Sequence, residues 1–131
     1  EQSYRDGKKD GPYTWGYENG QKYAEGTYKD GKRHGPDKTW HENGQKRDKG
    51  TYKDGKQDGL WTTWRDNGQK AGESTWKDCK EDGLTTQWYE NGQKKEVGNI
   101  KDGKLDGLFI KYNEDGTEKS RQTYKDGELV D

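Results

Sequence analysis

A repetition of 24 residues is the feature of this sequence that most limits its fold. Two short sequence markers recur with this period. One of them, usually Lys-Asp-Gly, recurs from residues 5–7 to residues 125–127. Repetition at a fixed spacing of this size is typical of solenoids and other arrays of stacked supersecondary units. The tetrapeptide Asn-Gly-Gln-Lys begins at Asn19, Asn43, Asn67 and Asn91.

Each repeat carries two turn signals, Asn-Gly and Asp-Gly, and both predict two-residue β-hairpins. A type I′ turn needs φ > 0 at both central residues, which Asn, Asp and Gly tolerate. The runs between these turns are rich in Trp, Tyr and Thr, which favour strands. The predicted turn residues are Asn19, Gly20, Asp30, Gly31, Asn43, Gly44, Asp54, Gly55, Asn67, Gly68, Asn91, Gly92, Asp102 and Gly103.

These signals predict an all-β fold. We expect an elongated single-sheet antiparallel β-meander solenoid of 24-residue hairpin repeats. Residues 1–131 would form one repeat domain of about five and a half repeats, hence roughly eleven strands and a sheet about 50 Å long. A bulge or bend is expected at Asp82-Gly83, because glycine inside a strand often marks one.

The turn at residues 67–68 predicts a pairing register for the strands around it. Without a bulge, the facing pairs are Arg65 with Lys70, Trp64 with Ala71, and Trp61 with Ser74. A bulge would shift this register by one residue.

Glycines are expected to lie beneath aromatic rings of the neighbouring strand. The position of Ser74 is occupied by glycine at residues 26, 50 and 98. A ring can therefore cover a bare cross-strand glycine, as Tyr13 would cover Gly26.

Composition indicates a sheet with little conventional core. Only 21% of the 131 residues are hydrophobic and 39% are charged, which by itself suggests disorder. However, aromatic residues make up 12% and fall at fixed repeat positions, and the net charge is only −1. We therefore expect a thin sheet held by cross-strand pairs and aromatic ladders.

Charge and hydropathy exclude several classes of partner. The near-neutral charge with interleaved Lys and Asp argues against nucleic-acid binding. No apolar run approaches the length of a transmembrane segment. The single cysteine permits no internal disulfide. The sequence has no Met and begins inside a repeat, which fits a matured product, an excised fragment or a sequence recovered without its gene. Of these we favour removal of a signal peptide, and a secreted or cell-surface location over a cytoplasmic one.

The repeat resembles the variant MORN repeat family, in the bacterial branch often labelled YwqK-family antitoxin. The resemblance is carried by residues 59–70, Gly-Leu-Trp-Thr-Thr-Trp-Arg-Asp-Asn-Gly-Gln-Lys, and by residues 50–59, Gly-Thr-Tyr-Lys-Asp-Gly-Lys-Gln-Asp-Gly. It covers essentially the whole chain and implies an open meander of hairpins that acts as an interaction module. Some members are proposed immunity partners of toxins, and eukaryotic relatives are linked to scaffolding and lipid head groups. The resemblance brings no catalytic motif and no cofactor.

Aromatic side chains at repeat positions are the candidate contacts for a partner. One interpretation is a stacking platform for sugars or for side chains of a partner protein. The other, which we favour, is an internal ladder that holds the sheet together. Both hold if one face stays exposed. The candidates are Tyr28, Trp40, Tyr52, Trp61, Trp64, Trp76, Trp88, Tyr112 and Tyr124.

The remaining chemical signals are weak. Lysine columns, such as Lys22, Lys46, Lys70 and Lys94, run beside acidic columns that cancel their field, so we expect solvated strand ends rather than an anion site. Residues 54–59 faintly resemble a calcium loop but contain a lysine, which favours turn chemistry. Finally, His34, His41 and Cys79 lack zinc spacing, and Cys79 replaces a turn glycine at a strained position.

Taken together, the sequence predicts a non-catalytic repeat scaffold that contacts another protein. Unpaired strands at residues 1–4 and 128–131 would allow copies to add head to tail into a filament. The alternatives are an antitoxin-type module that caps a toxin with one sheet face, and a surface carbohydrate-binding module built on the Trp columns.

Overall fold

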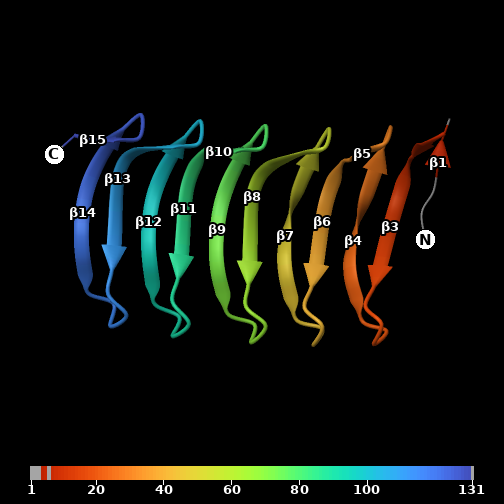
Figure 1. The fold of residues 1–131 in the computed structure, drawn as a ribbon, viewed down its shortest axis with the longest axis horizontal. Coiled ribbons are helices and arrows are strands. Elements are labelled where there is room, and N and C mark those ends of the chain that lie inside the picture. The colour runs from red at the N-terminus through yellow and green to blue at the C-terminus, as the bar shows by residue number, and fades with distance from the viewer. Residues whose placement is uncertain (1–3, 6, 131) are drawn as a thin grey trace.

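The computed structural model describes residues 4–5 and 7–130 and confirms the all-β prediction. These residues form a 13-stranded open antiparallel sheet and a separate two-stranded sheet, with strands following one another in meander order. No helix occurs among them, so none has the length and apolarity that a membrane span requires. Figure 1 shows an elongated single layer with β1 and β15 at opposite ends of its long axis.

The strands alternate in direction along the whole sheet. Strands β5 and β10 pair beside β4 and β9, while β1 and β2 form the small sheet. The strands are β1 (Tyr4–Arg5), β2 (Lys8–Lys9), β3 (Gly11–Gly16), β4 (Lys22–Lys29), β5 (Lys32–Arg33), β6 (Gly35–Trp40), β7 (Lys46–Lys53), β8 (Lys56–Trp64), β9 (Lys70–Lys77), β10 (Lys80–Glu81), β11 (Gly83–Trp88), β12 (Lys94–Lys101), β13 (Lys104–Tyr112), β14 (Glu118–Lys125) and β15 (Glu128–Leu129).

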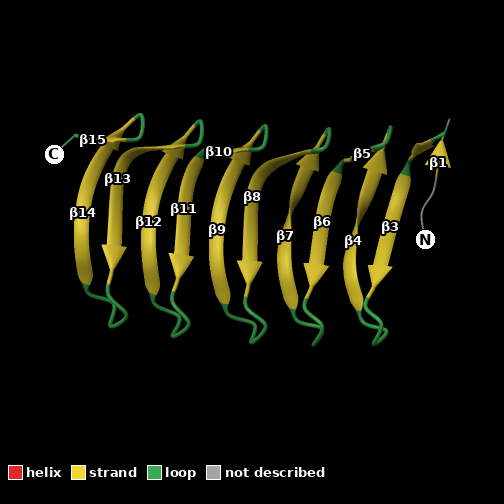
Figure 2. Ribbon diagram, viewed as in Figure 1, coloured by secondary structure: helices red, strands yellow, loops and turns green. Residues whose placement is uncertain are grey.

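The two turn types lie on opposite long edges of the sheet, as the green segments in Figure 2 show. At the Asp-Gly edge, φ is positive at both turn residues, as at Asp54 (51°) and Gly55 (83°). This is the sign pattern of a type I′ turn. The expected bend also occurs: β10 ends at Glu81, β11 begins at Gly83, and φ at Gly83 is 123°.

The type I′ prediction is wrong at the Asn-Gly edge. Gly68 has φ 90°, whereas Asn67 keeps a negative φ. The Gly68 N–H donates to the carbonyl of Arg65 at 2.9 Å, so Asp66 and Asn67 are the central turn residues and the glycine follows them. A turn followed by a left-handed glycine belongs to the longer class of hairpin loops. The same correction applies to the turns that begin at Asn19, Asn43 and Asn91.

The longer loop changes the register beside it. Trp61 faces Ser74, as expected from the sequence. Nearer the loop, the register shifts between Thr63 and Trp64, so that Trp64 faces Lys70. The expected pairs of Trp64 with Ala71 and of Arg65 with Lys70 are therefore wrong, because Arg65 belongs to the loop and Ala71 is the extra residue of a bulge.

The conventional core is as small as the composition suggested. Among the described residues, the buried hydrophobic side chains are Tyr13, at 1% exposure, and Ala24, at 4%. The buried polar or charged ones are Asp37, Thr62 and Thr86. Stability must come mainly from contacts within the single layer, which repeat from one hairpin to the next.

Candidate interaction surfaces

One face of the sheet, which we call the ring face, carries aromatic rings lying over cross-strand glycines. A Cβ added to Gly26 would lie 2.6 Å from the Tyr13 hydroxyl, and one added to Gly98 would lie 2.5 Å from Phe109. A Cβ added to Gly50 would lie closer than 3.0 Å to the indole of Trp61. The predicted cover of Gly26 by Tyr13 is therefore present, and glycine is required where the rings lie.

An arginine joins the rings at the N-terminal end of the ring face. The Arg33 guanidinium carbon lies 5.3 Å from the ring centroid of Tyr52, 5.9 Å from that of Tyr13 and 6.0 Å from that of Trp15. The guanidinium also donates to the Tyr52 hydroxyl at 3.2 Å. These are cation–π contacts in a partly dry setting, where such contacts are strongest.

A buried carboxyl completes this cluster. Asp37 is 6% exposed, and the Tyr13 hydroxyl donates a hydrogen bond to it. Burial raises the pKa of Asp37, and the hydrogen bond from Tyr13 and the charge of Arg33 only partly oppose this rise. Burial, followed by the bond to Asp37, also raises the pKa of Tyr13. For Arg33, burial alone would lower the pKa, but hydrogen bonds with Tyr28 and Tyr52 raise it.

Contacts within the sheet occupy the other candidate rings of this face. The Trp61 indole donates to the Thr51 carbonyl at 3.1 Å, and the Trp76 indole donates to the Ser74 hydroxyl at 2.7 Å. Tyr124 packs edge-on against Phe109, with centroids 6.1 Å apart. These contacts are what the internal-ladder interpretation predicts.

The opposite face, which we call the leucine face, carries a ladder of alternating aromatic rings and lysines. Trp64 faces Lys70 across the β8–β9 pair, and the Lys70 ammonium then lies 5.8 Å from the ring centroid of Trp88 in the next repeat. The corresponding distances are 5.7 Å from Lys22 to Trp40 and 5.6 Å from Lys46 to Trp64. The lysine column expected to be solvated is therefore partly engaged with the rings.

Beside this ladder runs a row of exposed leucines that sequence reasoning did not single out. Leu60 and Leu84 are each 58% exposed, and Leu108 is 42% exposed. They stand 24 residues apart on β8, β11 and β13. The sequence contains a signal for this row: the same repeat position is proline in the two earlier repeats, at Pro12 and Pro36, and leucine in the three later ones.

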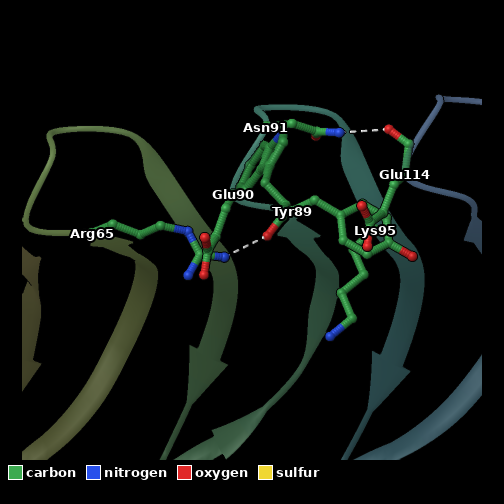
Figure 3. A pocket seen from close by; sticks show the side chains of 7 residues that line it. Arg65, Tyr89, Glu90, Asn91, Lys95 and Glu114 are labelled. Atoms are coloured by element: carbon green, nitrogen blue, oxygen red, sulfur yellow. Dashed lines mark hydrogen bonds between the residues drawn. The ribbon is translucent and has the colours of Figure 1, made fainter.

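Side chains stitch the Asn-Gly loops together along their edge. Tyr89 donates to the carbonyl of Tyr112 at 2.7 Å, and Arg65 donates to that of Trp88 at 2.9 Å. Asn91 donates to the carbonyl of Glu114 at 2.7 Å. Figure 3 shows these side chains lining a shallow hollow, whose wall also includes Glu90 and Lys95. The mixed charge and the mutual bonds of this hollow indicate loop stacking.

The weak metal and redox signals do not come together in the structure. His41 occupies the stitching position of its loop, where its ring Nε2 lies 2.9 Å from the carbonyl oxygen of Trp64. Over residues 4–5 and 7–130, no group of three His, Cys, Asp or Glu side chains could hold a metal ion. Cys79 is exposed and sits in its turn at φ 66°, as its replacement of a glycine implied.

Comparison with protein families agrees with the repeat seen in the sheet. The family model described as MORN repeat variant matches residues 9–30, 33–54, 57–78 and 81–102. A comparison with curated proteins gives no significant match. The four consecutive matches cover most of the chain and coincide with the hairpin repeats, so the chain belongs to the MORN repeat variant family.

Proposed function

We propose that this chain is a non-catalytic scaffold that contacts other proteins, including copies of itself, by adding a strand to its sheet. The observation that carries the proposal is the outer edge of β14. Within the described residues, β14 pairs with β13 on one side. On its other side, Tyr124 and Lys125 pair with β15 and the Thr123 carbonyl accepts a bond from the Val130 N–H, while the rest of the strand faces no neighbouring strand. A strand edge of this kind accepts a further strand by backbone hydrogen bonding.

The junctions between repeats show how such a strand would fit. β9 joins β11 of the next repeat through only two facing pairs, Glu73 with Thr86 and Gly72 with Gln87. β14 is the equivalent of β9 and β3 the equivalent of β11, so β3 of a second copy would bring Trp15 opposite Ser120. Addition in this register is heterologous and can continue from copy to copy.

One element opposes this addition. β15 (Glu128–Leu129) stands at the repeat position of β2 (Lys8–Lys9), five periods along the sequence. In the proposed junction, β15 of one copy and β2 of the next would require the same place beside β14. One of these short hairpins must therefore leave, and deletion of residues 126–131 should speed assembly.

Proline on the free edge of β14 tests this proposal. The Thr123 carbonyl accepts a bond from the Val130 N–H and so points outward, which places the N–H of Arg121 on the same outer side. Arg121→Pro removes that outward donor and leaves the inward bonds to β13 intact, as prolines on edge strands do. We expect concentration-dependent fibres in electron micrographs of the wild-type protein and of Arg121→Thr, and none for Arg121→Pro. Wild-type particles that stay single at millimolar concentration would refute head-to-tail addition.

A further inference from the structure

The four loops that contain Asn-Gly-Gln-Lys have the same tetrapeptide, yet the structure holds their asparagines in two different ways. In three loops the side-chain amide donates to a backbone carbonyl of the following loop: Asn19 to Glu42 at 3.1 Å, Asn43 to Asp66 at 2.6 Å, and Asn91 to Glu114 at 2.7 Å. In the third loop, Asn67 donates instead to the Gln69 side chain of its own loop, at 3.4 Å. Among the described residues, no hydrogen bond joins the Asn67 side chain to the next loop.

The glutamine of the third loop also makes no contact with the next loop. In the other loops, this side chain lies 3.1–3.5 Å from where a Cβ on the glycine of the following loop would stand, in the pairs Gln21–Gly44, Gln45–Gly68 and Gln93–Gly116. A Cβ added to Gly92 would meet nothing within 4 Å, and Gln69 turns back towards Asn67. Two contacts present at the other junctions are therefore missing between the third and fourth loops.

Arg65 is the remaining tie across this junction. Its guanidinium donates to the Trp88 carbonyl at 2.9 Å, beside the hollow drawn in Figure 3. In the described part of the chain, this is the single side-chain hydrogen bond between residues 65–69 and 88–93, whereas each of the other three junctions has two. The Arg65 Nε is buried without a hydrogen-bond partner, which weakens the junction further. A segment with fewer bonds opens more readily than its equivalents.

We propose that Asn67 is a site of spontaneous deamidation, and that it reacts ahead of the other three asparagines. Asparagine followed by glycine is especially prone to this reaction, because glycine has no side chain to hinder attack by its backbone nitrogen. The Gly68 nitrogen bonds to the side-chain carbonyl carbon of Asn67, the bond from that carbon to Nδ2 breaks, and ammonia leaves with the proton of the Gly68 N–H. Asn67 is exposed, so water reaches the resulting cyclic succinimide. Hydrolysis at the former side-chain carbonyl gives aspartate, and hydrolysis at the main-chain carbonyl gives isoaspartate.

The bond to the next loop governs the rate because ring closure moves the side-chain amide. The amide must turn so that its carbon meets the glycine nitrogen, and its Nδ2 must leave. A hydrogen bond from Nδ2 to a carbonyl of the next loop opposes both movements. Two other bonds recur in all four loops and so do not distinguish them: the glycine N–H donates to the carbonyl three residues earlier, and the asparagine Oδ1 accepts from the glutamine N–H.

The two products differ in what they do to the loop. The last loop has aspartate at this repeat position, and Asp115 accepts a bond from the Thr117 N–H at 2.9 Å. Asn67 accepts the equivalent bond from the Gln69 N–H at 3.0 Å, so aspartate at position 67 fits the same loop and adds only a negative charge. Isoaspartate places an extra carbon in the main chain, which breaks the bond that closes the turn and opens the junction.

Timed incubation of the native protein, followed by peptide mapping with mass spectrometry, tests the proposal. The four loops lie in tryptic peptides of different sequence, so each asparagine is followed separately. We expect Asn67 to convert about fivefold faster than the other three, the effect of one net hydrogen bond. In concentrated urea, where the bonds between loops are lost, the four asparagines should convert at similar rates. This readout does not require assembly, so it is independent of the edge addition proposed above.

Gln69→Ala tests the remaining hold on Asn67. This variant removes the side-chain partner of the Asn67 amide, so Asn67 should convert faster still. The matched control is Gln93→Ala, which should change the Asn91 rate less, because the Glu114 carbonyl still holds that amide. If Asn67 converts no faster than the other asparagines in the native protein, the proposal is wrong. An advantage of Asn67 that persists unchanged in urea would overturn it as well, since the cause would then lie in the local sequence.

Discussion

The same Gly→Ala substitution should have opposite effects at two positions of the ring face. At Gly50, a Cβ would collide with the Trp61 indole at less than 3.0 Å. At Gly72, the nearest atom is the Thr86 carbonyl oxygen at 3.6 Å, which is an ordinary contact. Both glycines lie inside strands, and neither has a positive φ. The two variants therefore differ chiefly in what the added methyl group meets.

The magnitudes follow from the two environments. Overpacking at Gly50 should cost roughly 1–3 kcal/mol, and loss of the bond from the Trp61 indole to the Thr51 carbonyl about 1 kcal/mol more. Replacing glycine by alanine in a strand, apart from any new contact, stabilises the folded state by about 0.5–1 kcal/mol. We expect Gly50→Ala to lower the free energy of unfolding by about 2 kcal/mol and Gly72→Ala to raise it by about 0.5 kcal/mol.

Urea titration followed by tryptophan fluorescence and circular dichroism measures this difference. The free energy of unfolding of a small protein falls by about 1–3 kcal/mol per molar urea. The expected difference in free energy between the two variants therefore separates their urea midpoints by about 1 M. If Gly50→Ala proves at least as stable as Gly72→Ala, the rings do not lie on the glycines as described, and the reasoning fails.

Three further substitutions probe the turns and the buried cluster. Cys79→Gly should raise the free energy of unfolding by about 1 kcal/mol in urea titration, since it relieves a left-handed residue, and no gain would contradict that strain. Arg33→Lys should lower the free energy of unfolding by about 1–2 kcal/mol, because lysine lacks the guanidinium that bonds the Tyr52 hydroxyl. Gln57→Lys, at the equivalent position of the next repeat, should have little effect, and equal effects of the two substitutions would refute the cluster. Burial raises the pKa of Asp37 above its ordinary 3.8, so stability is lost as pH rises from 3.8 through the folded-state pKa. Asp37→Asn should flatten that decline in urea midpoints measured from pH 4 to 7, and an unchanged profile would argue against it.

The hairpin repeat was predictable because its signals are local. Asp54-Gly55 has the φ signs of a type I′ turn, as its sequence predicts. Counting from a two-residue loop also gives the pair of Trp61 with Ser74, but only because the longer loop and the extra residue Ala71 offset each other. The Asn-Gly loops were mispredicted because the dipeptide suits two loop classes. In the structure each loop is held by a local bond, such as that from the Gln69 N–H to the Asn67 side-chain oxygen, and by bonds to the next loop, such as that from Asn91 to Glu114. The sequence of a single loop does not reveal the second kind of bond.

The surfaces were less predictable than the repeat. In the sequence, Trp40 and Trp64 fit either a ligand platform or an internal ladder. The structure is needed to show that the ammonium groups of Lys22 and Lys46 lie over these two rings. The arginine cluster was missed because no other repeat has an arginine at the position of Arg33. A comparison of the repeats, which looks for what they share, does not single this residue out. The leucine row was missed for a related reason, since it begins only at the third copy.

Cross-strand nuclear Overhauser effects test the sheet most directly. We expect contacts from the Trp61 indole protons to the α-protons of Gly50, and contacts between Trp64 and Lys70 across the β8–β9 pair. Contacts of Trp64 with Ala71, together with a Gly50 that shows no ring-shifted α-protons, would contradict both the register and the packing on which the account depends.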